Sequence, residues 1–376
     1  MRFVYWTQQF WPFVGGVEVL GTKYVAAMRA RGHEPVVVTG HGPRRRPDTE
    51  VHEATPIHRL PFHDALTCGD PALVLETART VRTLLDDIGP DLIHVNITDP
   101  SVFFLLRARH PTPAGDAPWV VSMRVAPDVA GAGAGSILGD ALRRAAAISV
   151  ASRAVVDELE ALAPGVAARS VVIPNGLDTD GPEPTDPPTG PPVIAGLGRL
   201  VTDKGFDTAV DAFAQVAPDH PSARLVIGGD GPERTPLAAR ARALGVGGAV
   251  DLPGWVPPDR VRSFHAAASF VVMPSRWREA FGLVAVEAML SGRAVIASDT
   301  GGLPEVVLHG RTGLLVAPED PDALAAAMAS LLDDPAWATE LGRAGRLHAL
   351  ERFGLDRYVA EHETLYTDVV TSRRKS

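Results

Sequence analysis

Two glutamates eight residues apart, Glu279 and Glu287, carry the clearest chemical signal in this sequence. Glu279 follows an apolar run that predicts a buried strand, and Glu287 lies inside the helix expected after it. The first N–H groups of that helix, at Gly282, Leu283 and Val284, have no acceptor within the helix and favour a bound phosphate. The two carboxylates can then contact different parts of one extended ligand. Taken alone, glutamates at this spacing are also common on solvated helix surfaces.

The loop that contains Arg199 and Lys204 is a second candidate. It follows another apolar run, and Lys204 stands out because lysine occurs only at positions 23, 204 and 375. Two fixed cations stabilise a departing diphosphate most strongly in the transition state, when its negative charge grows. The alternative interpretation is a pair of ordinary surface cations in a loop between a strand and a helix.

These two stretches resemble motifs of the retaining family-four glycosyltransferases, which have the GT-B fold. The stretch around Glu279 is similar to the family's E-x7-E motif, and the stretch around Arg199 is similar to its G-R-L-x-x-x-K-G loop. The resemblance implies that Glu279 contacts hydroxyls of the donor sugar and that Glu287 holds the ribose. It also implies that Arg199 and Lys204 grip the diphosphate.

Further stretches resemble the same family, in the same order along the chain. Gly15 and Gly16 lie in a P-x-x-G-G-x-E loop, which in the family faces the donor diphosphate and the acceptor. Gly254 and Val256 lie where the family frames the nucleotide base. Three more matches are Ile173–Asp178, Gly228–Glu233 and Thr300–Glu305. The resemblance therefore covers nearly the whole chain.

The acceptor side departs from the family pattern at Arg124. Many relatives have a histidine near this position, after the strand that ends close to residue 123. A guanidinium cannot act as a general base, but it can bind phosphate or an acidic acceptor; the equal alternative is an arginine paired at the domain edge. His94 and Asn96, at the end of another expected strand, are further candidates to line an acceptor site, although a lone strand-end histidine is more often structural.

No side-chain base is obligatory in the retaining mechanism usually proposed for the family, because the departing phosphate oxygen takes the proton of the acceptor. Asp178 and Asp180 have the D-x-D spacing of metal-dependent glycosyltransferases, but their place at a Pro-rich linker favours a structural role. No other cluster has the spacing of metal ligands. We expect catalysis without a metal or other cofactor, with Arg199 and Lys204 supplying the positive charge.

Short apolar runs alternate with helix-length segments, which is typical of βαβ units and mainly parallel sheets. The expected fold is therefore α/β, and the resemblance specifies GT-B, with two Rossmann-like domains whose parallel sheets face each other across a cleft. We predict an acceptor-binding domain over residues 1–176, a linker over 177–192 and a nucleotide-sugar-binding domain over 193–354. A last helix, about 355–372, is expected to pack back on the first domain.

The strands are predicted from the apolar runs themselves. In the first domain they are expected at 2–7, 35–39, 91–95, 119–125, 147–151 and 170–173. In the second domain they are expected at 192–197, 223–227, 249–252, 270–274, 294–297 and 313–316.

Composition narrows the class of protein further. With 376 residues and 45% hydrophobic content the chain can form two cores, and a net charge of −9 disfavours nucleic-acid binding. Cys68 is the only cysteine, so no intrachain disulfide can form. No apolar run approaches the roughly 20 residues of a transmembrane helix, and the start does not resemble a secretory signal. We expect a cytoplasmic protein.

The expected activity is that of a retaining, metal-independent hexosyltransferase. The donor would be a nucleotide diphosphate sugar, UDP-glucose or UDP-N-acetylglucosamine first, and the partner a small polar acceptor such as a cyclitol or aminocyclitol in bacterial secondary metabolism, including antibiotic biosynthesis. A GT-B-like nucleotide-sugar epimerase and a non-catalytic nucleotide-sugar-binding protein stay open as alternatives. A nicotinamide dehydrogenase is less favoured because neither glycine-rich turn has the dinucleotide fingerprint. The sequence does not indicate an oligomeric state.

Overall fold

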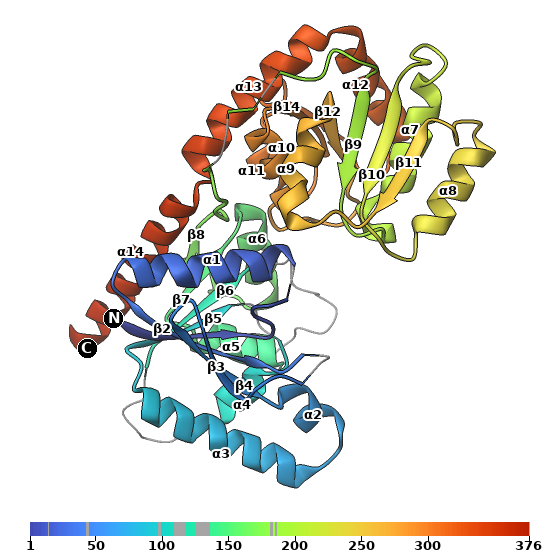
Figure 1. The fold of residues 1–376 in the computed structure, drawn as a ribbon. Coiled ribbons are helices and arrows are strands. Elements are labelled where there is room, and N and C mark those ends of the chain that lie inside the picture. Colours follow the sequence, from blue (N-terminus) through green and yellow to red (C-terminus); the bar gives the residue numbers. More distant parts are fainter. Residues whose placement is uncertain are drawn as a thin grey trace. The chain divides into compact units, whose positions relative to one another are not determined.

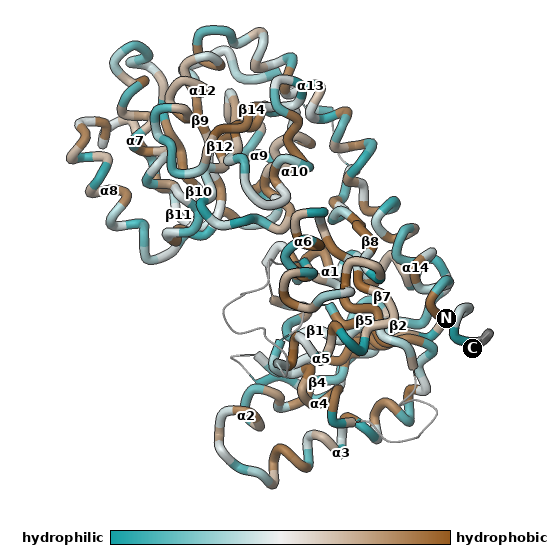
Figure 2. The backbone as a smooth tube through the Cα atoms, turned by 180° about the vertical axis from the view of Figure 1, so that it is seen from behind, coloured by the Kyte–Doolittle hydropathy of each residue, from teal (hydrophilic) through white to brown (hydrophobic). Residues whose placement is uncertain are grey.

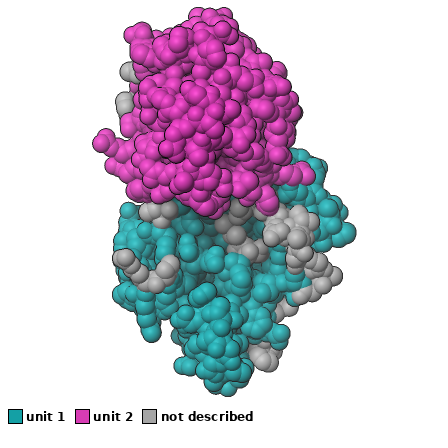
Figure 3. All heavy atoms as spheres, turned by 90° about the vertical axis from the view of Figure 1, so that its right-hand side faces the viewer, with its two compact units in different colours: residues 1–176, 355–376 teal, residues 177–354 magenta. Residues whose placement is uncertain are grey.

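The chain divides into two compact units. The computed structural model describes residues 1–13, 15–42, 45–96, 99–108, 117–124, 136–180, 183–184 and 186–375. Unit 1 comprises Met1–Gly176 and Leu355–Ser376, and unit 2 comprises Leu177–Gly354 (Figures 1 and 3). The polypeptide therefore passes between the units twice, and unit 1 is built from both ends of the chain.

Unit 1 contains an eight-stranded sheet with the order β3-β4-β2-β1-β5-β6-β7-β8. All neighbouring strands are parallel except β3 and β4, which pair antiparallel. The strands are β1 (Arg2–Thr7), β2 (Glu34–Gly40), β3 (Thr49–His52), β4 (Thr55–Leu60), β5 (Leu92–Asn96), β6 (Trp119–Met123), β7 (Ala147–Val150) and β8 (Ser170–Val172).

The hairpin β3–β4 was not among the predicted strands. β3 is an edge strand whose residues are exposed or half-buried, so it needs no apolar run to form. Its turn uses Glu53 and Ala54 with positive φ instead of the glycine or asparagine that signals a hairpin. The predicted extension of β6 to Val125 lies outside the described residues.

Helices of unit 1 pack on this sheet and include one from the far end of the chain. They are α1 (Gly16–Ala30), α2 (Phe62–Thr67), α3 (Pro71–Ile88), α4 (Val102–Arg107), α5 (Ile137–Arg144), α6 (Arg153–Leu162) and α14 (Leu355–Lys375), with the short 3-10 helix η3 (Ala167–Arg169). α14 lies beside α1 (Figure 1). It adds Tyr358, Val359, Leu365 and Tyr366 to the core under β1 and β5. The last helix thus completes the core of unit 1.

Unit 2 contains a six-stranded, fully parallel sheet with the order β11-β10-β9-β12-β13-β14. Its strands are β9 (Val193–Leu197), β10 (Arg224–Gly228), β11 (Val250–Gly254), β12 (Phe270–Met273), β13 (Ala294–Ser298) and β14 (Gly313–Val316). Every residue of β12 and β13 is buried, as expected for central parallel strands covered on both faces. The hydropathy colouring is accordingly brown around β12 and β14 (Figure 2).

The helices of unit 2 follow its strands in regular alternation. They are η4 (Thr202–Lys204), α7 (Phe206–Val216), α8 (Arg234–Ala243), α9 (Pro258–Ala266), α10 (Leu283–Leu290), α11 (Leu303–Val306), α12 (Pro321–Asp333) and α13 (Pro335–Arg352). The described residues of the predicted linker belong to this unit, and the Leu177 N–H donates to the Phe353 carbonyl at 2.8 Å. The predicted fold class, two parallel-sheet Rossmann-like units, is confirmed.

Candidate active site

The sheet of unit 2 changes its direction of winding between β9 and β12. β10 and β11 lie on one side of β9, and β12, β13 and β14 lie on the other. Because all six strands are parallel, the loops after β9 and β12 leave the same edge at the point where the strand order reverses. Open α/β sheets bind their ligands at such a position. The two loops carry Arg199, Lys204 and Glu279.

Lys204 and Glu279, 75 positions apart in sequence, meet at this edge. The Lys204 ammonium and Glu279 carboxylate form an ion pair, and the same carboxylate oxygen accepts a hydrogen bond from Ser275 Oγ at 2.8 Å. The exposed fractions of the two charged side chains are 24% and 14%, so both are partly shielded from water yet reachable. The cation and the carboxylate that the sequence predicted therefore lie together in one site.

Arg276 ties the two loops into a rigid pair. Its backbone N–H and that of Trp277 both donate to the Asp203 carbonyl, at 2.9 and 3.2 Å. Its guanidinium donates to the Thr202 carbonyl at 3.0 Å and to Asp207 at 2.6 Å. Burial opposes ionisation of Asp207, but the hydrogen bond and charge of Arg276, together with backbone hydrogen bonds, outweigh it and lower the pKa of this carboxyl. Lys204 thus projects from a loop that is fixed on both sides.

Ser275 and Arg276 were missed by the sequence reasoning. They lie four and three positions before Glu279 in the motif, so proximity was the available signal. Neither could be assigned a role from the sequence. Ser275 bonds to the Glu279 side chain, and Arg276 bonds to residues of the loop more than 60 positions earlier, which only the fold brings near.

Backbone contacts that leave no room for a side chain bring the loops together. A Cβ on Gly205 would lie 2.1 Å from the Pro274 carbonyl oxygen, and one on Gly301 would lie 2.3 Å from the Glu279 carbonyl oxygen. The next residue, Gly302, donates its N–H to that same Glu279 oxygen at 2.6 Å. The loop of Thr300–Glu305, singled out in the sequence, therefore supports the backbone of Glu279.

α10 begins at the same edge, directly after Glu279. Gly282 is its N-cap, with φ of 105° and no side-chain capping bond, and the first donors within the helix are Ala285 and Val286. The N–H groups of Leu283 and Val284 precede them and by position have no acceptor inside the helix. Glu287 is half-buried on this helix. The arrangement offers an anion a helix N-terminus close to the ion pair.

The remaining donor-side candidates lie on the same sheet edge. Arg199 is exposed and, among the described residues, forms no ion pair. Gly254 ends β11 and accepts a hydrogen bond from the Gly229 N–H at 2.8 Å, and Val256 is half-buried just beyond it. These positions stand two strands away from β9 along the edge.

The other predicted site residues belong to unit 1. Gly15 and Gly16 begin α1, where the extended backbone of Gly15 accepts a hydrogen bond from the Val19 N–H at 2.9 Å. Asn96 ends β5, is almost fully buried and stands in register with Thr7 of β1.

His94 lies in the core of unit 1, where its ring contacts the Tyr366 hydroxyl of α14. Burial, and then the charge of Arg124, lower the pKa of His94 well below its usual value. The residue is therefore a neutral histidine within the core, away from any exposed strand end.

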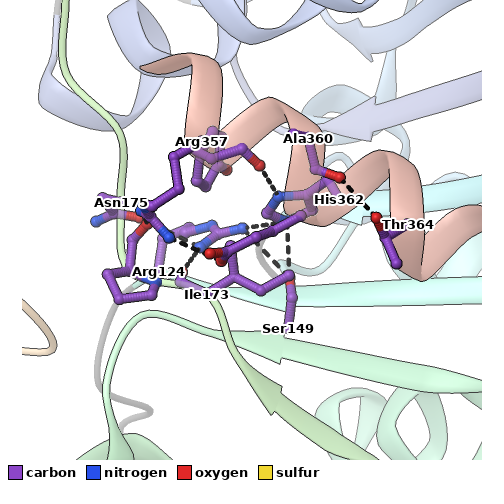
Figure 4. Close-up of polar contacts among 11 residues, drawn as sticks. Arg124, Ser149, Ile173, Asn175, Arg357, Ala360, His362 and Thr364 are labelled. Carbon is purple, nitrogen blue, oxygen red and sulfur yellow. Dashed lines mark hydrogen bonds and ion pairs between the residues drawn. The ribbon is translucent and has the colours of Figure 1, made fainter. Parts of the chain in front are cut away.

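Arg124 is 4% exposed and sits in a buried network. Its guanidinium donates to the Ile173 carbonyl, Asn175, Ser122 and Ser149, each at 3.2 Å, and lies 2.8 Å from His362 Nε2 (Figure 4). Of the two interpretations of this arginine, the geometry matches the structural one, with partners inside unit 1.

Asp99, which the sequence reasoning missed, is a further candidate on unit 1. Oδ1 accepts the Ser101 N–H at 2.7 Å, whereas the buried Oδ2 has no partner among the residues that the structure describes. Burial raises the pKa of this carboxyl despite the hydrogen bonds from Ser101. Nothing in the sequence signals that this carboxyl is buried.

Metal ligands do not gather in the described part of the chain: it contains no group of three His, Cys, Asp or Glu side chains placed to hold an ion. In the D-x-D stretch, Asp178 Oδ1 accepts the Asp180 N–H at 3.0 Å, which is a local turn. No helix among the described residues combines the length and apolar character needed to cross a membrane.

Comparisons with known proteins show which families and folds this chain resembles. The model described as Glycosyltransferase Family 4 matches residues 14–180, and the one described as Glycosyl transferases group 1 matches residues 179–348. A D-inositol 3-phosphate glycosyltransferase from Acidothermus cellulolyticus is 39% identical over 191 residues, which cover 48% of this chain and 42% of that protein. The chain spans about half or less of the length of the curated relatives it matches.

Solved structures share the whole architecture. Sucrose-phosphate synthase from Thermosynechococcus elongatus superposes with a TM-score of 0.82 at 24% identity, covering 99% of each chain. HepE from Anabaena, solved in complex with UDP-glucose, gives a TM-score of 0.78 at 21% identity, covering 98% of this chain and all of that one. The fold is that of the GT-B glycosyltransferases. Because the two family matches together run from residue 14 to residue 348, the chain belongs to glycosyltransferase family four.

Proposed function

We propose that this protein is a retaining hexosyltransferase that moves a sugar from a nucleotide diphosphate donor to a small polar acceptor. The observation that carries the proposal is the Lys204–Glu279 pair at the switch point of the unit 2 sheet, beside the N-terminus of α10. A cation, a helix N-terminus and a carboxylate are the groups needed to hold a diphosphate and an adjacent sugar. They also argue against a purely structural role for the pair.

Each group has a defined task in the proposed reaction. Lys204, Arg199 and the first N–H groups of α10 bind the diphosphate and stabilise the charge that grows as the bond between the anomeric carbon and the phosphate oxygen breaks. Glu279 accepts hydrogen bonds from sugar hydroxyls, and Glu287 accepts those of the ribose. The acceptor oxygen forms the new bond on the face that the phosphate leaves, and the departing phosphate oxygen takes the acceptor's proton.

The existing ion pair prepares the site for its substrate. An ammonium has three donors, so Lys204 can bind a phosphate oxygen and keep one hydrogen bond to Glu279. In return, hydrogen bonds from Lys204 and Ser275 hold the Glu279 carboxylate in one orientation. Electrostatic groups that are already oriented do not have to reorganise during the reaction, which is the source of their catalytic effect.

For the donor we propose UDP-glucose or UDP-N-acetylglucosamine, and for the acceptor a cyclitol or aminocyclitol. The donor proposal is supported by the architecture shared with HepE, whose structure contains UDP-glucose. The acceptor proposal is supported by similarity to the D-inositol 3-phosphate glycosyltransferase. Cations on the protein replace the charge of a metal, so the proposed reaction needs none.

The test is a mass-spectrometric screen of donors and acceptors with wild type, Lys204→Ala and Glu279→Gln. Loss of one group that stabilises the transition state costs about 10²–10³ in kcat, so both variants should lose transfer to that extent while remaining folded. Full activity in either variant would contradict its assigned role.

Two controls separate the alternatives. Incubation with UDP-sugar alone would reveal an epimerase by a changed sugar, and binding without turnover across the acceptor panel would reveal a non-catalytic binding protein. Activity should persist in EDTA. A loss that Mg²⁺ or Mn²⁺ restores would contradict metal-independent transfer.

A further inference from the structure

The two connections between the units run together. Leu177, which opens unit 2, and Gly354, which closes it, form a parallel β-bridge, and the Leu177 N–H donates to the Phe353 carbonyl at 2.8 Å. On the unit 1 side, the first connection is preceded by Ile173–Gly176 and the second is followed by α14. Whatever holds these two unit 1 segments therefore controls both attachments of unit 2.

Arg124 contacts both of these segments with one guanidinium. Nη1 donates to the Ile173 carbonyl and to Asn175 Oδ1, both at 3.2 Å, on the first segment. Nη2 lies 2.8 Å from His362 Nε2, and the guanidinium carbon lies 4.9 Å from the centre of the Tyr358 ring, both on α14. Figure 4 shows the arginine between the two segments.

The same guanidinium is anchored to the sheet of unit 1. Nη2 also donates to Ser122 of β6 and Ser149 of β7, at 3.2 Å each, and both serines are fully buried. Arg124 itself directly follows β6. The side chain therefore connects two neighbouring strands of the sheet with both segments that lead to unit 2.

The histidine in this network is held in its neutral form by geometry. His362 Nδ1 lies 2.8 Å from the Tyr358 carbonyl, which can only accept, so Nδ1 carries the proton. Nε2 is then the acceptor for the Arg124 Nη2–H. Burial first, and then the charges of Arg124 and His94, lower the pKa of His362 well below its usual value. The pair is consequently a directional bond, Arg124 to His362.

Stability alone does not account for this arginine. Among the described residues, no carboxylate forms an ion pair with Arg124, and its Nε has no partner. A buried charge with only neutral partners carries a desolvation cost that an apolar side chain would avoid. What the guanidinium provides, and an apolar residue does not, is a set of directional donors that reach four elements at once.

We propose that Arg124 is a positioning residue that fixes the unit 1 ends of both connections, so that unit 2 is attached through one stiff double link instead of two independent tethers. Only the expected effect of Arg124 on turnover rests on the proposed function. The link itself is defined by the contacts of Arg124 and can be measured without any activity.

The test is hydrogen-exchange mass spectrometry on the full-length protein. Arg124→Met should raise exchange roughly tenfold or more in peptides covering 173–177 and 353–362, while peptides from β5 and from residues 178–352 stay unchanged. Asn175→Ala removes a contact to the first segment only, so its increase should be confined to 173–177. Val81→Ala, in the buried face of α3, is the matched control for general loosening of unit 1 and should leave both segments unchanged.

Three results would overturn the proposal: unchanged exchange at both segments in Arg124→Met, a uniform increase across unit 1, or the same pattern in Val81→Ala. If Arg124→Met does not fold, Arg124→Lys and Asn175→Ala carry the test, since a lysine keeps the charge but cannot bond to both segments in the same geometry. Where turnover is detected, Arg124→Lys should lower kcat and leave the UDP dissociation constant unchanged. Absence of turnover in wild type would affect only the proposed function.

Discussion

At the scale of single residues, the Lys204–Glu279 pair shows why two ordinary charges become chemically useful. Each is common on protein surfaces, but here both are partly shielded, and Ser275 donates a hydrogen bond to the Glu279 carboxylate. Partial desolvation strengthens their interaction with a bound phosphate or sugar, because the effective dielectric constant is lower than in water. The value of the pair lies in its fixed orientation, which the loops of unit 2 supply.

His265 gives a prediction about pH that concerns unit 2 alone. It is fully buried at the end of α9, and neither ring nitrogen has a partner among the described residues. Burial, with a smaller effect from Arg293, lowers its pKa to about 4. As the pH falls below about 6.5, His265 therefore becomes protonated in the unfolded chain but stays neutral in the folded chain. Above about pH 6.5 the free energy of unfolding does not depend on this histidine's protonation. Between pH 6.5 and pH 4 the free energy of unfolding falls by about 1.4 kcal/mol for each pH unit, because protonation favours the unfolded chain.

The variant His265→Leu should remove this dependence. Chemical denaturation at several pH values between 4 and 8 would measure the free energy of unfolding for wild type and variant. We expect the two curves to differ most below pH 6, with the variant the more stable. Parallel curves would show that His265 does not couple folding to protonation.

At the scale of elements, a glycine contact supports the position of Glu279. Gly301 has φ of 58°, and a Cβ there would clash with the Glu279 carbonyl oxygen at 2.3 Å. Gly310 has a similar φ of 69° but open space around the Cβ position. The two glycines therefore share the backbone strain of a substitution, about 1 kcal/mol, and differ in the clash.

We predict that Gly301→Ala lowers kcat at least tenfold, because the clash must displace the Glu279 backbone, whereas Gly310→Ala keeps its activity. Steady-state kinetics and thermal unfolding of both variants would test this. Equal activity in the two would show that the backbone of Glu279 tolerates the displacement.

The sequence was sufficient for most strands but not for all of them. Buried parallel strands such as β12 are continuous apolar runs, so their presence could be predicted to within a residue or two. The edge strand β3 has no such run, because one of its sides faces solvent and pairing with β4 alone defines it. A pattern based on burial cannot detect an element that is not buried.

The site residues divide in the same way. Glu279 and Lys204 could be identified because their motif is local, and a parallel sheet brings the ends of neighbouring strands together. The surroundings of Arg124 could not, because its partner His362 stands 238 positions later and only the folded chain brings α14 across β6 and β7. The residues next to Arg124 in the sequence are compatible with either an exposed strand end or a buried network.

At the scale of the whole molecule, unit 1 depends on a helix that the chain reaches last. α14 buries Tyr358, Val359, Leu365 and Tyr366, and Tyr366 accepts a hydrogen bond from the Tyr24 hydroxyl at 2.7 Å. Burial of one such side chain contributes about 1.5–3 kcal/mol, so the four together approach the stability of an ordinary domain.

Deleting residues 355–376 should therefore unfold unit 1 and leave unit 2 folded. Calorimetry would show loss of one unfolding transition, and hydrogen exchange would assign the surviving protection to residues 177–354. Deletion of 372–376 alone, which spares those four side chains, is the control and should behave like wild type. Protection of β1 and β5 in the longer deletion would contradict this dependence.

Because unit 1 combines residues 1–176 with residues 355–376, the two units become complete at different times during synthesis. While the ribosome is still making the middle of the protein, the first 176 residues lack the helix that closes their core, whereas the contiguous stretch of Leu177–Gly354 has all its parts as soon as it emerges. The second unit can finish folding before the first. The early segment must wait, with apolar surface uncovered, until α14 has been synthesised.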